Sequence, residues 1–171
     1  LRSAHAACDL LLSQVGYKFV AHDDDAARLA ADLGIATYRP DNALVASFPE
    51  YRLGHHLERL LLLGRRVAIA RQLLPAATVQ RAPTVERSVV GVHTLATHVA
   101  PQRADAPSPS PRFLLCVNAG ARGAMHALAV DVTSATILHG PLQPASNGVA
   151  AAATAALGGL LDALAPVEIV I

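Results

Sequence analysis

The stretch Val15-Gly16-Tyr17-Lys18-Phe19 decides how the first part of this chain is interpreted. Gly16 is expected to end the segment before it, because glycine readily takes the left-handed conformation that closes a helix. We predict a helix from Ala4 to Val15 and a strand from Tyr17 to Ala21. Without further information, Tyr17 and Lys18 would be the ordinary start of a strand, with one aromatic ring on the core.

Periodicity and turn residues predict a mixed sheet with helices for the rest of the first unit. Asp23 or Asp24 is expected to accept the free amide hydrogens of a helix that ends at Gly34. The remaining predicted elements are strands at 35–38 and 43–48 around the turn Pro40-Asp41-Asn42, a helix at 50–63 after Pro49, and strands at 66–70 and 87–93.

The helix predicted over 50–63 has one apolar and one basic side. Its core side carries leucines at helical spacing, and Gly64 follows as its C-cap. Its other side is predicted to carry Arg52, His56 and Arg59, because positions i, i+4 and i+7 share a face. This face is either solvated or a contact for phosphates.

A proline-rich break from Ala100 to Pro111 separates the first unit from a second one. In the second unit we expect strands at 113–118, 125–131 and 136–139, with a hairpin turn over 119–123. A helix at 150–164, which Gly158-Gly159 could bend, and a strand at 167–171 follow. This order matches the start of a ribonuclease-H-like α/β unit, cut off after its fourth strand.

Composition sets wide limits on function. The 171 residues, 53% of them hydrophobic, suffice for one domain or two small ones. Neither a bilayer-spanning segment nor a signal peptide is recognisable, and the missing initial Met suggests an excerpt of a longer protein. Cys8 and Cys116 match no disulfide or zinc spacing, which favours a reducing compartment. The net charge of +1 neither indicates nor excludes DNA binding.

Several motifs together resemble the MutS family of DNA mismatch repair proteins. They are Val15 to Phe19, Asp24-Asp25-Ala26, Ala46-Ser47-Phe48-Pro49, Tyr51-Arg52-Leu53 and Val67 to Gln72, joined after the break by Phe113 to Cys116 and Leu164 to Ile169. The resemblance implies a mixed-sheet α/β mismatch-binding domain at 1–99, a linker at 100–111 and a truncated ribonuclease-H-like connector domain at 112–171.

The Tyr17-Lys18 pair resembles the branch of the family that binds insertion-deletion loops as part of MutSβ. Most MutS proteins have Gly-Asp-Phe-Tyr-Glu here, so Lys18 stands in the place of the Phe and Val20 in that of the Glu. The loop-binding branch has Gly-Tyr-Lys-Tyr, although Val20, Ala21 and His22 replace its following aromatic and Arg residues. The resemblance implies that Tyr17 and Lys18 enter the DNA.

The resemblance also implies backbone contacts, partners and cofactors. Arg52, His56 and, less directly, Arg59 would contact the DNA backbone, with Asn42 and Ser47 in nearby turns. The full protein would act in the nucleus as a heterodimer with the second eukaryotic MutS homologue and would engage MutL-type proteins. ATP and magnesium are expected only for the full-length protein, because no G-x-x-x-x-G-K-[ST] motif occurs here. We therefore expect a DNA-binding fragment without ATPase activity.

Two alternatives stay open from the residues alone. Asp131 at a strand end could belong to a metal-dependent, ribonuclease-H-like nuclease, but a structural hairpin role is favoured because matching carboxylates are lacking. The chain could also be a protein-interaction fragment that does not bind DNA. Of the other polar groups, Asp23-Asp24-Asp25 fits helix capping better than a cation site, and His55-His56 fits a surface pair better than a metal site.

Overall fold

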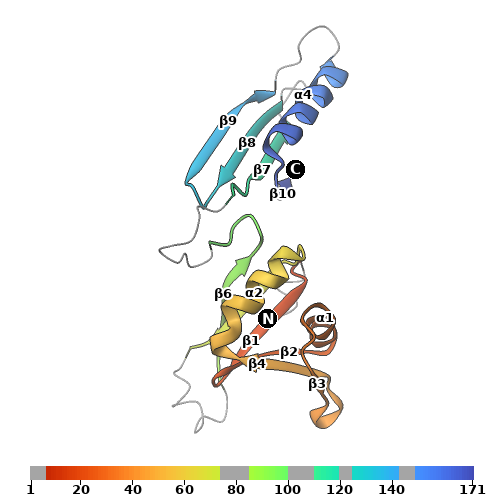
Figure 1. The fold of residues 1–171 in the computed structure, drawn as a ribbon, viewed down its shortest axis with the longest axis vertical. Coiled ribbons are helices and arrows are strands. Elements are labelled where there is room, and N and C mark those ends of the chain that lie inside the picture. Colours follow the sequence, from red (N-terminus) through yellow and green to blue (C-terminus); the bar gives the residue numbers. More distant parts are fainter. Residues whose placement is uncertain (1–6, 74–84, 100–109, 120–124, 143–148) are drawn as a thin grey trace. The chain divides into compact units, whose positions relative to one another are not determined.

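The computed structural model describes residues 7–73, 85–99, 110–119, 125–142 and 149–171 (Figure 1). The chain divides into two compact units, Leu1–Thr94 and Leu95–Ile171, which are described separately. Most of the predicted break at 100–111, most of the predicted turn at 119–123 and the first residues of the predicted N-terminal helix lie outside the described residues.

Unit 1 contains a six-stranded mixed sheet with the order β3-β4-β2-β1-β5-β6. β1 and β5 pair in parallel, and the other neighbours pair antiparallel. This confirms the predicted mixed α/β class for the unit. The strands are β1 (Leu10–Val15), β2 (Lys18–His22), β3 (Thr37–Tyr38), β4 (Val45–Pro49), β5 (Val67–Gln72) and β6 (Arg87–His93).

The helix predicted from Ala4 to Val15 is wrong over its described part, because Leu10–Val15 forms the strand β1. Leu10, Leu12 and Gln14 are buried and alternate with less buried residues, which is the period of a strand. The run Leu10-Leu11-Leu12 fits either structure when it is read locally. Pairing with β2 on one side and β5 on the other decides for the strand.

The helix α1 (Asp23–Leu33) ends as predicted at Gly34, which has a φ of 71°. Its start differs from the prediction, because His22 occupies the N-cap position and no side chain caps the helix. Instead, the Leu11 N–H donates to Asp25 Oδ2 at 3.1 Å, so this buried carboxylate fastens β1. α1 packs on β2 and β4 through Ala26 and Leu29.

The predicted helix at 50–63 begins with a 3-10 turn, η3 (Glu50–Arg52), and continues as α2 (Leu53–Leu62). Leu57, Leu60 and Leu61 are buried, as their spacing predicts. The helix ends before Gly64, whose φ of 75° suits glycine. A second 3-10 turn, η2 (Pro40–Asn42), lies where the Pro40-Asp41-Asn42 turn was predicted.

Unit 2 has the predicted order of three strands, a helix and a strand. Its elements are β7 (Leu114–Ala119), β8 (Met125–Asp131), β9 (Thr136–Leu142), α4 (Val149–Leu164) and β10 (Glu168–Val170). The sheet order is β10-β7-β8-β9, with β10 parallel to β7. Leucines of α4 pack on a core of Leu115, Val117, Ala127 and Ala129. Within the described ranges, no helix is long and apolar enough to cross a bilayer.

Candidate nucleic-acid interface

The turn between β1 and β2 presents Tyr17 at its tip. Val15 pairs with Lys18, so Gly16 and Tyr17 form a two-residue hairpin turn. Gly16 has a φ of 59°, and glycine at the first central position is the signature of a type II′ turn, whose twist matches the flanking strands. This confirms that Gly16 ends a segment, although the segment is a strand.

A hydrogen-bond network, here called the turn network, fastens the base of this turn to β5, β6 and η3. It consists of Gln14, Glu50, Arg71, Gln72 and Arg87. The Gly16 N–H donates to Gln72 Oε1 at 2.7 Å, and the Gln72 N–H donates to Gln14 Oε1 at 3.4 Å. Gln14 Nε2 also donates to the Gly16 carbonyl at 3.4 Å.

Two arginines complete the turn network. Arg87 Nε donates to the Gln14 carbonyl at 2.7 Å. Arg71 pairs with Glu50 at 2.7 Å, and Gln14 Nε2 donates to the other oxygen of Glu50 at 3.3 Å. Because three segments outside the hairpin, β5, β6 and η3, converge on the turn, its backbone is positioned by the fold and not only by the hairpin.

Tyr17 and Lys18 point into solvent from this fastened base. The Tyr17 side chain is 65% exposed, and Lys18 is also exposed and forms no ion pair within the described ranges. Lys18 is the only lysine of the sequence. An exposed aromatic ring beside an unpaired cation on a fixed turn is a suitable combination for stacking on a base and attracting a phosphate.

Arg52 lies close to the turn through the η3 backbone. The Glu50 N–H donates to the Tyr17 carbonyl at 2.9 Å, which joins the start of η3 to the tip of the hairpin. Arg52 is exposed, and its guanidinium lies 5.9 Å from the ring centroid of Tyr51. The backbone segments that carry Tyr17, Lys18 and Arg52 are thus joined to each other.

The prediction that His56 shares an outer face with Arg52 and Arg59 is wrong. His56 is only 6% exposed, and its ring meets that of Phe48 edge-on at 4.7 Å. The position follows from helix geometry, since residue 56 lies one turn from the buried Leu60. Burial lowers the pKa of His56, with further lowering by His55, Arg52 and Arg59, so a neutral imidazole occupies the core.

The other predicted contacts are more widely spread. Arg59 is exposed on α2. Ser47 is half-buried on β4 opposite Val20, and its hydroxyl lies 3.5 Å from that of Tyr38. Asn42 is exposed in η2, which precedes β4 at its Val45 end, whereas the turn lies near its Pro49 end. A five-residue strand spans about 15 Å, so Asn42 is remote from the turn.

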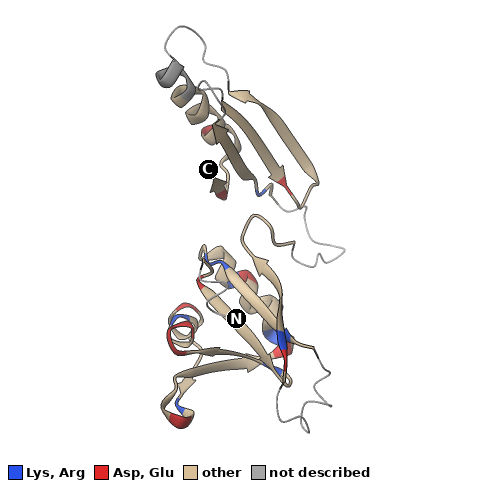
Figure 2. Ribbon diagram, turned by 180° about the vertical axis from the view of Figure 1, so that it is seen from behind, with Lys and Arg blue, Asp and Glu red and all other residues tan. Residues whose placement is uncertain are grey.

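Charged side chains are unevenly divided between the two units (Figure 2). The described part of unit 2 contains one basic residue, Arg112, and three acidic ones. In unit 1, two of the arginines are engaged by carboxylates, Arg65 by Asp32 and Arg71 by Glu50. Lys18, Arg52 and Arg59 carry charge that no ion pair among the described residues neutralises. Among the described residues, most of the basic groups suited to DNA therefore lie in unit 1.

Sequence reasoning missed the residues of the turn network as positioning groups. Arg71 and Gln72 belong to a motif that carries the family resemblance, which is the only signal for them, and Arg87 was expected to begin a strand. Gln14 lies inside the segment that was predicted to be a helix. Glu50 was expected only to be the first residue of the helix at 50–63. Their partners are up to 73 residues away, as for Arg87 and Gln14, so local patterns carry no information about the contact.

Asp131 accepts hydrogen bonds from the residues of the turn that follows β8. Its side chain is fully buried and accepts hydrogen bonds from the Thr133 N–H at 3.0 Å, the Thr133 hydroxyl at 2.6 Å and the Ser134 hydroxyl at 2.6 Å. Burial raises the pKa of Asp131, but hydrogen bonds, led by that from Ser134, outweigh it and lower the pKa to about 2. The residue has a structural role, and no group of three potential metal ligands occurs among the described residues.

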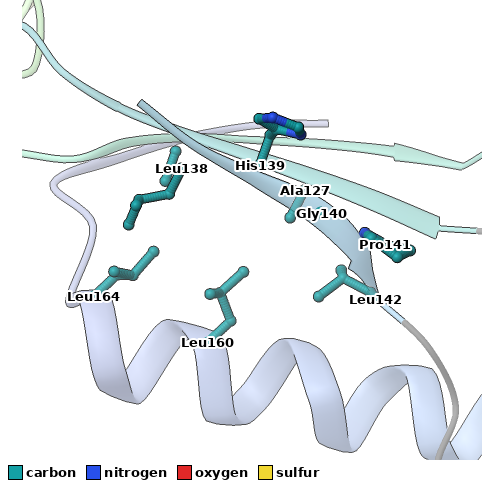
Figure 3. Close-up of a pocket in the computed structure, with 9 residues that line it drawn as sticks. Ala127, Leu138, His139, Gly140, Pro141, Leu142, Leu160 and Leu164 are labelled. Atoms are coloured by element: carbon teal, nitrogen blue, oxygen red, sulfur yellow. The ribbon is translucent and has the colours of Figure 1, made fainter. Parts of the chain in front are cut away.

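Unit 2 also contains an apolar pocket of about 220 Å³ between the sheet and α4 (Figure 3). Leu160 and Leu164 project from α4 towards Leu138 and Leu142 of β9. Gly140 and Ala127 lie side by side in the sheet and leave the space unfilled. The pocket is explained by small residues under the helix. Its one titratable lining residue, His139, carries its ring on the side of the strand that faces away from α4 (Figure 3).

Comparison with known proteins agrees with this arrangement. The MutS domain I family matches residues 3–101. DNA mismatch repair protein MSH3 of Cryptococcus neoformans var. neoformans serotype D is 36% identical over 94 residues, which are 53% of this chain and 8% of that protein. Msh3 of Dictyostelium discoideum is 32% identical over 111 residues, 62% of this chain and 8% of that protein.

MSH3 of Arabidopsis thaliana is 34% identical over 68 residues, which are 40% of this chain and 6% of that protein. The matched region is thus less than a tenth of each of these three relatives. The family match extends from residue 3 to residue 101, which is more than half of the chain and includes the turn with Tyr17 and Lys18. The chain therefore belongs to the MutS family, through its domain I, and is similar to the MSH3 proteins.

Proposed function

We propose that this chain is the DNA-binding N-terminal part of an MSH3-type mismatch repair protein and recognises insertion-deletion loops and bent, mispaired DNA. The observation that carries the proposal is the exposed Tyr17-Lys18 pair on a turn fastened by the turn network. Family membership and the MSH3 names of its relatives support the same function.

The physical basis of recognition is deformability. Tyr17 would stack on an opened base step, and the few kcal/mol lost in unstacking would be offset by bending that brings more backbone to the protein. Lys18, Arg52 and Arg59 would attract the phosphates that the bend gathers. An extrahelical loop is already hinged, so the proposed contact favours it over a matched duplex without reading base sequence.

The rest of the proposal concerns the whole protein. Unit 2 is proposed to be the beginning of the connector domain, in line with its strand-strand-strand-helix-strand order. The complete protein would form a MutSβ-type heterodimer with the second eukaryotic MutS homologue in the nucleus and would engage MutL-type proteins. ATP and magnesium would be bound by its other domains. Asn42 and Ser47 remain proposed as peripheral contacts, whereas His56 is assigned to packing.

The test measures binding of this chain at fixed salt to three labelled duplexes, one with a small extrahelical loop, one with a single mismatch and one fully matched. We expect preference for the loop. The double variant Tyr17→Ala/Lys18→Ala should lose this preference, since stacking of one base is worth about 1–3 kcal/mol. Equal binding of the variant and the unchanged chain to all three duplexes would refute the proposed contact.

Two features of the chain sharpen this test. Tyr38→Ala is a matched control, because Tyr38 is 50% exposed but pairs with Val45, at the end of β4 away from the turn. Lys18 is the only lysine, so an amine-reactive reagent labels a single side chain, which mass spectrometry separates from the terminal amine. Loop DNA should protect Lys18 from labelling, and matched DNA should protect it less.

A further inference from the structure

We propose that Tyr51 is a second aromatic contact to DNA, held by Arg52 and placed on the η3 segment beside Tyr17. The inference deepens the proposed function and rests on it. It adds a stacking group for a nucleotide that flanks the opened base step, where the family resemblance had suggested only Arg52 as a backbone contact.

The first observation is the exposure of Tyr51. Its side chain is 81% exposed, more than those of Tyr17 and Tyr38. A tyrosine in such a position contributes little to the core, because its ring area stays in water. Tyrosine is well suited to wet interfaces, since it combines a large apolar ring with a hydroxyl group.

The second observation is the attachment of Tyr51 to the hairpin turn. Glu50, its direct neighbour, donates its N–H to the Tyr17 carbonyl at 2.9 Å, and Pro49 pairs with Lys18. The Glu50 side chain is held by Arg71 at 2.7 Å and by Gln14 at 3.3 Å. Consecutive Cα atoms are about 3.8 Å apart, so Tyr51, the residue after Glu50, lies close to the backbone of Tyr17. A DNA strand bound at Tyr17 would therefore pass within a few nucleotides of Tyr51.

The third observation is the contact between Arg52 and Tyr51. The guanidinium lies 5.9 Å from the ring centroid, within the range of a cation–π interaction. This contact restricts the ring before binding, which lowers the entropy lost on stacking. It also places an unpaired cation against one side of the ring, where the phosphate of a stacked nucleotide would be attracted.

These observations define the ligand chemistry. The ring of Tyr51 would stack on the base or sugar of a nucleotide next to the opened step, while Arg52 contacts its phosphate. Stacking of this kind is tolerant of sequence, because every base has a π face. Two aromatic contacts on neighbouring segments would hold a bent strand at two points, so their contributions to loop preference should be partly independent.

The experiment compares Tyr51→Ala, Tyr51→Phe, Tyr17→Ala and the control Tyr38→Ala in binding to the duplex with a small loop at fixed salt. We expect Tyr51→Ala to weaken binding by about 5- to 150-fold, as for the loss of one stacked base. Tyr51→Phe should bind like the unchanged chain, because the ring is retained. The high exposure of Tyr51 predicts that all its variants fold, which thermal unfolding verifies.

The outcomes separate this inference from the proposed function. Loss of binding in Tyr17→Ala with no change in Tyr51→Ala would overturn the second contact and leave the proposed function in place. An equal loss in Tyr38→Ala would also overturn it, because the effect would then not be specific to η3. Failure of the unchanged chain to prefer the loop over matched DNA would overturn both. A loss confined to Tyr17→Ala and Tyr51→Ala supports both.

Discussion

Replacing Asp131 by Asn tests whether this carboxylate is structural. The change preserves size, and the amide oxygen can still accept from the Thr133 N–H and hydroxyl. The amide NH₂ then faces the Ser134 hydroxyl, which can turn to donate to Thr136 Oγ1 at 2.8 Å. What is lost is the charge on an acceptor of three hydrogen bonds. The two bonds from Thr133 persist but become neutral, and a hydrogen bond to a charged group is worth about 1 kcal/mol more than a neutral one, so we expect a loss of about 2 kcal/mol.

The assay is hydrogen exchange of the β8 and β9 amides, followed by mass spectrometry. A destabilisation of about 2 kcal/mol accelerates exchange through local opening by roughly 30-fold. Asp162→Asn is the matched control, because Asp162 is exposed in α4 of the same unit. Exchange in β1 to β6 should stay unchanged, because those strands belong to unit 1.

Acid provides a second measurement on the same residue. The pKa of Asp131 is lowered to about 2 in the folded state, against 3.8 as its ordinary value. Its contribution to stability is therefore complete above pH 3.8 and is lost as the pH falls towards 2. The Asn variant should lack this part of the acid dependence. Less than a threefold change in β8–β9 exchange at neutral pH, or magnesium-dependent DNA cleavage that Asp131→Asn abolishes, would refute the structural role.

Three further predictions concern the turn, the α2 helix and the pocket. Gly16→Ala should destabilise unit 1 by about 1–2 kcal/mol in urea unfolding, because alanine is strained at a φ of 59°, and should weaken loop binding. No change in either would contradict the role of the turn. Unit 1 should lose stability as the pH falls below 6.5, because burial first, then neighbouring cations, lowers the folded-state pKa of His56. This loss of stability in acid should be smaller in His56→Leu. Part of it should remain, because burial also lowers the pKa of His93. Gly140→Ala should stabilise unit 2 by about 0.4–1 kcal/mol, since a Cβ meets nothing within 4 Å and the unfolded chain loses freedom. A lower unfolding temperature of this variant would show that the strand needs glycine there.

The elements that local signals define were predicted well. β6 and β8 have the predicted bounds, and α1 ends at its glycine as expected. In each case the deciding information lies within a few residues, as strand alternation or as a C-cap glycine. The order of elements along the chain in unit 2 was predictable for the same reason, because each element has a clear period or turn.

β1 shows where such signals fail. Three consecutive leucines suit a helix or a strand, and the choice was made by partners 57 residues away, as in the pairing of Leu10 with Val67. His56 is a similar case, since its spacing places it equally close to the arginines and to Leu60. The contact of its ring with Phe48 on β4 shows that His56 faces the core.

The sequence by itself determined the family and the end of a segment at Gly16, because both depend on residue identity and short spacing. Only the tertiary structure decided that β1 is a strand, that His56 packs in the core, and that Gln14, Glu50, Arg71, Gln72 and Arg87 fasten the turn. The physical reason is that burial and hydrogen-bond partners arise from contacts between distant segments. Local propensity favours a structure, and those contacts select it.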